Sequence, residues 1–299
     1  MKNINVGGKI TMQAGVCVYS VLEDASNDYL GMFRAIADMG CKNIELLGGD
    51  YLRGGRFSDR FSARQVRDVV DELGMCVTGT HEKVEPGVDI VDHDWDRLMD
   101  YYETVGCCNI MLPSIWVADR EETLRLVDSI NKVGRRMKKR GFQFYLHTHS
   151  TEFRRQPDGS TLMDLILAET SPETMMVELD MVWAMRGGMD VCEMLNKLGA
   201  RCDMVHQKDL SKDFKGPVSI FEAARLAGDP DCDPKKAPAK YTCREDFAEV
   251  GTGVFDYDTV YQKLRKDGFV RYTIIENDAR METKLPTTRR ELAFIEKYL

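Results

Sequence analysis

The sequence predicts an α/β fold, a (β/α)₈ TIM barrel in which parallel strands alternate with helices. Two observations predict it. Short apolar runs alternate with amphipathic helical stretches along the chain, and the runs recur about every 30 residues, the length of one βα unit. Eight such units need about 250 residues, and the chain has 299, so we expect residues 1–299 to form one domain. A doubly wound sheet is the alternative, but it would usually have a glycine-rich turn after its first strand, and Tyr19-Ser20-Val21 offers none.

The predicted strands are short apolar runs, each followed by a stretch with helical periodicity. In chain order the strands cover residues 11–19, 41–47, 75–81, 109–112, 142–147, 175–180, 201–208 and 272–276. Between them, apolar residues spaced three or four apart indicate amphipathic helices. Ser62 starts one of these helices as an N-cap, and the basic end of the longest helix suits the helix dipole. The helices cover residues 27–39, 62–73, 95–105, 120–140, 161–169, 191–198, 257–267 and 287–298.

One interval breaks the repeat. The segment between the seventh and eighth strands is about 35 residues longer than a βα unit requires. The excess, about residues 211–247, is rich in Pro, Asp and Lys and has a short helical centre at residues 220–226. The insertion follows a strand end, where barrel active sites lie, so we expect an ordered, lid-like insertion over the barrel mouth or in a subunit contact. A disordered surface loop is the alternative.

Composition narrows the class of protein. Hydrophobic residues make up 43% of the chain and charged residues 30%, as in ordinary globular proteins. The net charge of −8 argues against a nucleic-acid partner, because phosphate binding needs a basic face. We expect no membrane association, because no apolar run approaches the roughly 20 residues of a membrane span, and the first residues lack the apolar core of a signal peptide. Nine cysteines without CxxC spacing fit reduced thiols, so we expect a cytoplasmic protein.

Polar side chains with metal-ligand or acid/base chemistry gather at the predicted strand ends, which converge on one mouth in a barrel. Only five histidines occur in the chain, and His147 and His149 lie on alternate positions of the stretch YLHTHSTEF. In a strand, such positions point to the same side. Chance is a poor account of eight polar residues at strand ends when the strand interiors hold almost no polar residues. The eight are Glu45, His81, His147, His149, Asp180, His206, Lys208 and Glu276.

A metal site is the most specific expectation from these residues. Asp180, His206 and Glu276 end three later strands and supply a mixed oxygen and nitrogen set that suits a divalent ion such as Mn²⁺ or Co²⁺. Either His147 or Glu152, from the fifth strand, would complete the set. Such an ion polarises a carbonyl and stabilises the enediolate formed when the neighbouring carbon loses a proton. We expect one divalent ion, with Mn²⁺ favoured and Co²⁺, Mg²⁺ or Zn²⁺ as alternatives.

Two residues are expected to assist the chemistry. His149 is the expected base or acid, because the pKa of histidine lies near neutrality. Lys208 shares a face with His206 and is expected to hold a substrate oxygen. A salt bridge from Lys208 to Asp209 or Glu249 is the structural alternative.

Four residues are expected to bind substrate. Glu45 and His81 lie at the ends of the second and third strands, facing the predicted mouth. Trp116 and Trp183 follow strand ends and can stack on a sugar face, with core packing as the alternative. His93, in the polar loop VDHDWD, is expected to be solvated.

Six motifs carry a family resemblance: NIELLGG, YLHTHSTEF, VELDMVWAMRGGMD, MVHQKD, FAEVGTGVFDY and YTIIEND. In this order they resemble the xylose isomerase-like barrels, within the broad group of sugar phosphate isomerases/epimerases that includes inosose dehydratases and ketose 3-epimerases. The resemblance implies a metal held by Asp180, His206, Glu276 and a fifth-strand residue, and it implies that Glu276 doubles as an acid/base.

One position departs from the family pattern. Many epimerases and dehydratases of the group carry glutamate where this chain has His147. A histidine there argues against a mechanism with two opposed glutamates and leaves His149 as the better base. A similar barrel is the larger subunit of the bacterial C-glycoside deglycosidases, which cleave 3-oxo-glycosides by proton abstraction and elimination.

The expected function is therefore metal-dependent proton abstraction beside a carbonyl of a sugar, cyclitol or 3-oxo-glycoside, giving isomerisation, epimerisation or elimination. Cleavage of 3-oxo-glycosides by a C-glycoside deglycosidase subunit is the first alternative. An abasic-site endonuclease and a non-enzymatic sugar-binding barrel are further alternatives. No cluster of Arg or Lys marks the strand ends, so we expect an unphosphorylated carbohydrate. We also expect a homo-oligomer or a complex with a small partner subunit.

Overall fold

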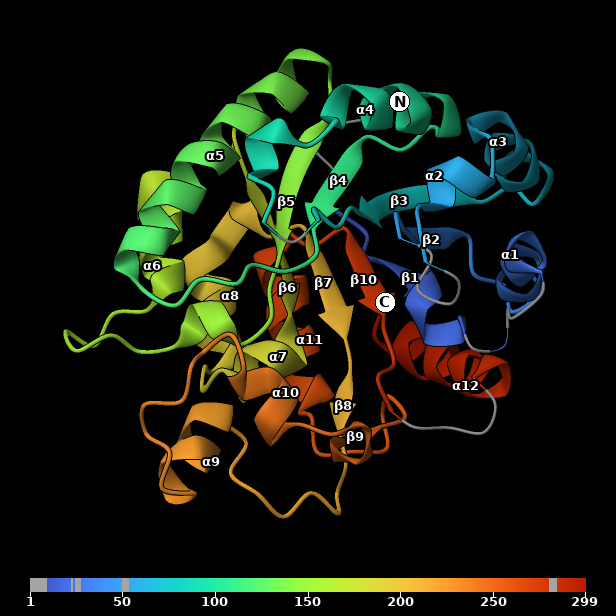
Figure 1. Cartoon of the computed structure of the whole chain (residues 1–299). Helices are drawn as coiled ribbons and strands as arrows, with labels where there is room; N and C mark the ends of the chain where they lie inside the picture. The colour runs from blue at the N-terminus through green and yellow to red at the C-terminus, as the bar shows by residue number, and fades with distance from the viewer. Residues whose placement is uncertain (1–9, 23, 25–27, 50–53, 86, 280–283) are drawn as a thin grey trace.

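A closed barrel of eight parallel strands forms the centre of the computed structural model, which describes residues 10–22, 24, 28–49, 54–85, 87–279 and 284–299 (Figure 1). Each strand pairs with its neighbour in chain order, and the last barrel strand closes on the first. The strands are β1 (Gln13–Cys17), β2 (Asn43–Leu47), β3 (Cys76–His81), β4 (Asn109–Leu112), β5 (Gln143–His147), β6 (Met176–Asp180), β7 (Met204–Gln207) and β10 (Tyr272–Ile275). The predicted (β/α)₈ fold is confirmed, and each predicted strand matches one of these eight.

Helices surround the barrel, except that α9 and α10 belong to the insertion between β7 and β10 (Figure 1). They are α1 (Tyr29–Ala37), α2 (Phe57–Arg60), α3 (Ala63–Glu72), α4 (Trp95–Val105), α5 (Arg120–Lys139), α6 (Leu162–Glu169), α7 (Met181–Arg186), α8 (Val191–Leu198), α9 (Ile220–Leu226), α10 (Ala237–Tyr241), α11 (Tyr257–Asp267) and α12 (Leu285–Ile295). Every predicted helix is found, although residue 27 of the first lies outside the described residues. Ser62 caps α3 as predicted, in a reciprocal capping box with Gln65.

Three short helices do not appear in the sequence-based prediction. These are α2, α7 and α10, with 4, 6 and 5 residues. A helix of one or two turns has room for only one or two positions of an apolar stripe, so its periodicity cannot be recognised. Of the three, α7 matters most here, because it begins directly after the predicted metal ligand Asp180.

The insertion between β7 and β10 is closed at its base by a small sheet. Strand β8 (Asp209–Leu210) pairs antiparallel with β9 (Phe247–Ala248), so both ends of the insertion lie side by side. The Asp209 carboxylate accepts backbone N–H groups of Gly251 at 3.0 Å, Gly253 at 2.9 Å and Phe255 at 3.0 Å. A side chain at position 253 would not fit, because its Cβ would lie 2.0 Å from the Leu210 carbonyl oxygen. The chain therefore leaves the insertion through a tightly held turn.

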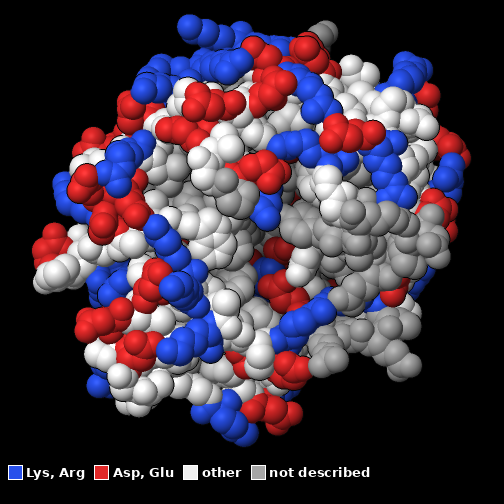
Figure 2. All heavy atoms as spheres, in the orientation of Figure 1, with Lys and Arg blue, Asp and Glu red and all other residues white. Residues whose placement is uncertain are grey.

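A buried arginine joins the body of the insertion to the barrel. Arg186, the last residue of α7, donates to the carbonyl oxygens of Val218 at 3.2 Å and Tyr241 at 2.5 Å. It also donates to Thr242 Oγ1 at 2.8 Å, and its guanidinium faces the Phe214 ring at 4.9 Å. These partners come from several parts of the insertion, so one side chain fastens the segment to α7. Figure 2 shows a hollow on this face of the molecule, with carboxylate atoms in its depth.

In the described part of the chain, no helix has both the length and the apolar character needed to cross a membrane. The single-domain organisation and the cytoplasmic location remain predictions.

A buried carboxylate joins the last helix to the barrel. Glu291 of α12 accepts from the Val250 backbone N–H at 3.0 Å and from the side-chain amide of Asn277, which follows β10. Its other oxygen is buried without a hydrogen-bond partner. Burial raises the pKa of Glu291 to about 7, although the two donors stabilise the charged carboxylate and lower the pKa in part.

We predict that Glu291→Gln becomes more stable relative to the wild type as the pH rises from 5 to 8. The folded protein holds the Glu291 proton up to about pH 7, whereas the unfolded chain loses it near its ordinary pKa of 4.5, so folding carries a penalty that grows between these values. Fully developed, the penalty is about 3 kcal/mol, because one pKa unit corresponds to about 1.4 kcal/mol. Glutamine keeps an acceptor oxygen without the charge.

Urea unfolding at both pH values measures the difference in the free energy of unfolding. Glu296→Gln, an exposed change near the same chain end, is the control and should show no pH-dependent difference from the wild type. A Glu291→Gln effect of equal size at pH 5 and pH 8 contradicts the assignment.

Candidate metal centre

Buried polar side chains from six strands meet at the carboxyl end of the barrel. They come from β2, β3, β5, β6, β7 and the residue after β10, where parallel strands place their carboxyl ends together. Two overlapping groups among the described residues have ligand atoms that all lie within 4.8 Å of one another. The upper group comprises His147, Asp180, His206 and Glu276, and the lower group comprises His81, His147, Glu178 and His206.

The upper group coincides with the predicted ligand set. Of the two alternatives for the fourth ligand, the structure places His147 in the group, whereas Glu152 belongs to neither group. Instead, Glu152 Oε1 accepts the backbone N–H of His149 at 2.6 Å, within a short 3₁₀ turn that follows β5. Strand β5 therefore ends too early to carry Glu152 to the other ligands.

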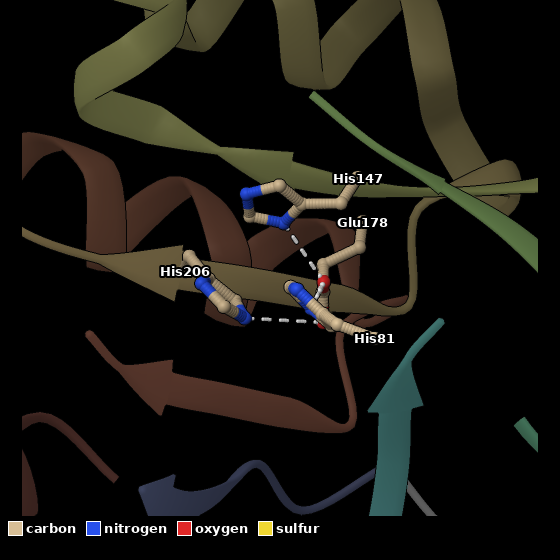
Figure 3. A group of neighbouring side chains, drawn as sticks. All are labelled: His81, His147, Glu178 and His206. Carbon is tan, nitrogen blue, oxygen red and sulfur yellow. Dashed lines mark hydrogen bonds and ion pairs between the residues drawn. The ribbon is translucent and has the colours of Figure 1, made fainter. Parts of the chain in front are cut away.

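In the lower group the carboxylate is already used by imidazole rings (Figure 3). Glu178 Oε2 lies 2.9 Å from His147 Nδ1 and 3.0 Å from His81 Nε2. Figure 3 shows the other ring nitrogens of His147 and His206 on a common side, away from Glu178. An ion bound by these outer nitrogens would sit with the upper group.

Glu45 has the same relation to His206. Its Oε1 lies 2.9 Å from His206 Nε2 and 3.0 Å from His81 Nε2. Carboxylates that accept from the second nitrogen of a metal-ligating histidine fix its tautomer and ring orientation. Glu45 and Glu178 thus occupy the positions of supporting carboxylates, one for each histidine of the upper group.

This placement corrects one sequence-based expectation, the substrate contact of Glu45. Glu45 lies in the middle of β2, fully buried and outside the cavity, because the strand continues two residues beyond it. A substrate contact by Glu45 therefore does not fit the structure. The ring of His81 borders the cavity, but its Nε2 faces two carboxylates rather than the open space.

One carboxylate of the upper group presents an acceptor without a hydrogen-bond partner. Asp180 Oδ1 caps α7 by accepting the Trp183 backbone N–H at 2.8 Å, and Asp180 Oδ2 is buried without a hydrogen-bond partner. Glu276 Oε2 lies 2.8 Å from His206 Nδ1. An unpartnered buried carboxylate oxygen is costly unless a cation is bound nearby, so the donor set fits a divalent ion.

Lys208 lies beside this group, although not with the predicted partners. Its Nζ lies 2.7 Å from Glu276 Oε2, 2.7 Å from Asp278 Oδ2 and 3.5 Å from Asp180 Oδ2. The salt bridge to Asp209 or Glu249 that was the structural alternative is therefore wrong, because Asp209 accepts backbone N–H groups instead. The other predicted partner, Glu249, binds Arg290 at 2.6 Å.

The charges of the site set the protonation states. Burial lowers the pKa of His147 well below its usual range and that of His149 to about 3, helped by nearby positive charges. Both rings are therefore neutral at pH 7. Burial opposes protonation of His206, but the charges of Glu178 and Glu45 outweigh it and raise the pKa well above normal.

Two other groups of the site are shifted in ways that affect metal binding. Burial raises the pKa of Asp180 to about 7, only partly offset by Lys208 and His206. Burial also disfavours the charged form of Glu276, but Lys208 and His206 together lower its pKa well below normal. Metal ligation requires ionised carboxylates and neutral imidazoles, so binding would release protons and weaken in acid.

A cavity of about 530 Å³ opens above the group. His147, His149, Lys208 and Glu276 are among the barrel residues that line it. Trp116 and Trp183 line it as well, but Trp116 is 54% exposed whereas Trp183 is buried, with ring contacts to His149 and Phe247. The insertion supplies one wall with Pro238, Ala239, Thr242, Cys243, Arg244 and Phe247.

Two residues of the site and its surroundings escape sequence reasoning, Glu178 and Asp278. Glu178 lies two residues before Asp180 on β6, so the two-residue period of a strand was an available signal for it, whereas Asp278 lies beyond the end of β10. The expectation that strand interiors are almost free of polar residues is wrong for Glu45 and Glu178. His93 is not solvated but buried, with its Nε2 3.2 Å from Arg56 and its ring edge-on to Trp95.

Comparison with known proteins agrees with this architecture. The sequence model of the family described as xylose isomerase-like TIM barrel matches residues 33–298. A sugar phosphate isomerase/epimerase from Parabacteroides distasonis superposes with a TM-score of 0.72 at 18% identity, covering 99% of this chain and 98% of that one. No curated protein matches the chain significantly.

Two further solved structures have titles that name a reaction. A 3-keto-D-glucoside 4-epimerase from E. coli has a TM-score of 0.65 at 17% identity, covering 96% of this chain and 100% of that one. A probable 3-DHS dehydratase from Bacillus anthracis has a TM-score of 0.66 at 14% identity, covering 95% and 99%. At these identities the likeness shows the fold.

We predict that Asp180→Asn lowers the affinity for Mn²⁺ by at least about 100-fold, more than the usual effect of altering a supporting residue. Asparagine keeps the oxygen that caps α7 and removes the ligand charge, so the fold should persist. Alanine would also remove the cap, at a cost of about 1 kcal/mol. Elemental analysis after dialysis and calorimetric titration with Mn²⁺ measure the change, and circular dichroism checks the fold.

Asp278→Asn is the matched control, because Asp278 binds Lys208 but belongs to neither ligand group. It should keep one ion per chain. If Asp180→Asn also keeps a full complement of tightly bound metal, the upper group is not the site. Loss of metal in Glu178→Gln would then place the ion in the lower group.

Proposed function

The chain belongs to the xylose isomerase-like TIM barrel family, which confirms the resemblance of its motifs, and from that premise we propose that it is a divalent-metal-dependent enzyme. It abstracts a proton beside the carbonyl of a sugar, cyclitol or 3-oxo-glycoside and yields isomerisation, epimerisation or elimination. One observation carries the proposal: a ligand group for a divalent ion lies at the floor of a cavity, beside a neutral histidine and a charged lysine. The family and the structural neighbours support a sugar-modifying enzyme.

His147, Asp180, His206 and Glu276 would hold the ion, with Glu178 and Glu45 orienting the two rings. Two imidazole nitrogens and two carboxylate oxygens suit Mn²⁺, with Co²⁺, Mg²⁺ or Zn²⁺ as alternatives. When bound, a divalent ion supplies Lewis-acid polarisation of a carbonyl and stabilises the negative charge that follows proton loss.

His149 is the proposed proton acceptor. Its ring lines the cavity, lies outside both ligand groups and is neutral at pH 7. Its Nδ1 is buried without a hydrogen-bond partner, so we assign proton transfer to Nε2. Ring contacts with His147 and Trp183, at centroid distances of 5.0 and 5.4 Å, restrict the imidazole to one orientation. A base fixed in this way needs no reorganisation when a substrate carbon approaches.

Lys208 and Glu276 complete the proposed machinery. Burial disfavours a charge on Lys208, but the carboxylates of Asp278, Glu276 and Asp180 raise its pKa well above normal. The ammonium therefore stays charged and can hold a substrate oxygen. Glu276 is kept ionised by Lys208 and His206. It therefore serves as a ligand and as a second base rather than as an acid.

The alternative functions fit the site less well. An abasic-site endonuclease needs several ions and a basic groove, whereas the two ligand groups share two histidines and so suit one ion. A sugar-binding barrel without catalysis would not require a base beside a complete ligand group. Elimination from a 3-oxo-glycoside remains within the proposal, because it begins with the same proton abstraction.

The insertion is proposed to act as the lid of this site. It forms one wall of the cavity, and Arg186 holds it against α7. Its outer side remains the proposed contact for a second copy or a small partner subunit.

We predict that His149→Ala keeps the metal but loses about 10² to 10⁴ in turnover, the usual contribution of a positioned acid or base. Exchange of solvent deuterium into the substrate should fall in parallel, because the abstracted proton has lost its acceptor. Elemental analysis, turnover and mass spectrometry on a panel of 3-oxo-glucosides and inososes measure the three effects. His147→Ala is the paired variant and should lose the metal. Metal loss in His149→Ala, or deuterium exchange at the normal rate, would mean that the two histidines have the opposite roles.

We predict that Arg186→Met releases the insertion. Trypsin should cleave within residues 212–240 at least about tenfold faster, because the carbonyl groups that Arg186 binds lose their donor, and opening of buried hydrogen bonds exposes the chain. The Michaelis constant should rise while bound metal remains.

Arg201→Met is the matched control. Arg201 also donates to backbone carbonyls, at 3.0 Å to Leu167 and 3.1 Å to Met175, but outside the cavity and the insertion. It should lower stability without increasing cleavage of the insertion. An Arg186→Met protein with unchanged cleavage and unchanged Michaelis constant would show that the insertion is held by other contacts and does not act as a lid.

A further inference from the structure

A second cavity of about 590 Å³ adjoins the first. Four residues line both cavities: Lys83, Pro113, Ser114 and Trp116. Each cavity has the size of an ordinary small-molecule site. The proposed proton abstraction uses only the first, so the second space has no role in the chemistry described so far.

The walls of the second cavity are mostly apolar. They include Val84, Val88, Ile90, Leu112, Ile115, Val117 and Leu126. Two of the large apolar side chains that line it are strongly exposed, Trp116 at 54% and Val88 at 43%. Exposed apolar side chains that cluster in a concave site usually mark a binding surface.

The charged residues of the second cavity do not form an anion site. Lys235, which reaches it from the insertion, pairs with Glu122 at 2.7 Å. Arg125 pairs with Glu121 at 2.5 Å. Two of the three cations that line the cavity are thus neutralised by neighbouring carboxylates, and Lys83 is the one that remains. One lysine does not make a phosphate site, so the apolar wall is the larger feature that a ligand would recognise.

We propose that the second cavity is a subsite for the aromatic aglycone of a glycoside whose sugar ring lies in the first cavity above the metal group. Trp116 stands at the boundary, where an indole face can contact both rings. The inference rests on the proposed function and narrows its substrate class: aryl glycosides, or their 3-oxo forms, rather than free sugars. The insertion then closes the subsite through Lys235 as well as the first cavity.

The test compares two ligands that differ only in the aglycone, 4-nitrophenyl β-D-glucopyranoside and methyl β-D-glucopyranoside. Calorimetric titration of the full chain loaded with Mn²⁺ gives the dissociation constants. The nitrophenyl glucoside should bind at least about tenfold more tightly, equivalent to about 1.4 kcal/mol. The measurement needs no turnover, so it does not depend on the outcome of the His149 experiment.

Two variants locate the aryl group. Val88→Asp places a charge in the apolar wall at an exposed position, so it should abolish the tenfold preference and leave the affinity for methyl glucoside unchanged. Trp116→Ala should weaken the nitrophenyl glucoside more than the methyl glucoside. Phe269→Ala is the control, because Phe269 is 41% exposed but lines neither cavity, and it should keep the preference.

Three outcomes overturn the subsite. They are equal affinities for the two glucosides, no binding of either glucoside, and a preference that survives both variants. If the preference holds but the Asp180 and His149 variants keep their metal and activity, the subsite stands and the proposed chemistry falls. If those variants behave as expected and the preference is absent, the chemistry stands and the substrate is not an aryl glycoside.

Discussion

The candidate site depends on contacts between two buried carboxylates and three imidazole rings. Glu178 lies between His147 and His81, and Glu45 lies between His206 and His81, at distances of 2.9 to 3.0 Å. These contacts use one nitrogen of each histidine in the upper group. The other nitrogen of His147 remains open to an ion, and that of His206 faces the Glu276 carboxylate at 2.8 Å. Removing one partner of a buried ionic pair usually costs about 3 to 5 kcal/mol, because the remaining charge is uncompensated. Orientation of the ligands and stability of the barrel are therefore coupled at these residues.

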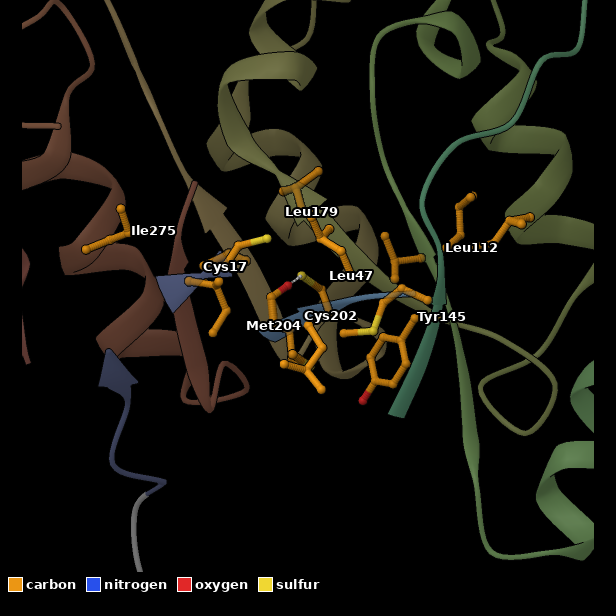
Figure 4. Packing of buried hydrophobic residues seen from close by; sticks show 14 of the residues in the cluster. Cys17, Leu47, Leu112, Tyr145, Leu179, Cys202, Met204 and Ile275 are labelled. Atoms are coloured by element: carbon orange, nitrogen blue, oxygen red, sulfur yellow. Dashed lines mark hydrogen bonds between the residues drawn. The ribbon is translucent and has the colours of Figure 1, made fainter. Parts of the chain in front are cut away.

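Apolar packing around this polar layer strengthens the interactions between its charges. Figure 4 shows Cys17, Tyr145, Leu179, Met204 and Ile275, from five barrel strands, in the buried cluster of the core. Such surroundings exclude water and lower the effective dielectric constant, so each charge interacts more strongly with its neighbours. The same burial lowers the pKa of His149 to about 3 and raises that of Asp180 to about 7. The core that stabilises the fold thus also sets the protonation states of the site.

One short helix connects the site with its cover. Asp180 ends β6 and caps the first turn of α7 with one oxygen, while the other faces Lys208. Six residues later, α7 ends at Arg186, which binds the insertion through four hydrogen bonds. A shift of the insertion would reach α7 through Arg186 and the metal group through Asp180. The insertion and the upper group are thus connected through one short helix.

The sequence by itself determined the barrel and most of the upper ligand group. Periodicity distinguishes strands from helices, and a closed parallel barrel brings its strand ends together, so Asp180, His206 and Glu276 could be grouped without coordinates. Only the tertiary structure shows that His147, and not Glu152, lies within reach of these three residues, and that Glu45 and Glu178 contact the histidine rings. Both depend on where β5 ends and on how side chains from different strands align inside the barrel. These distances arise from the stagger of the closed sheet, and separation along the chain does not encode them.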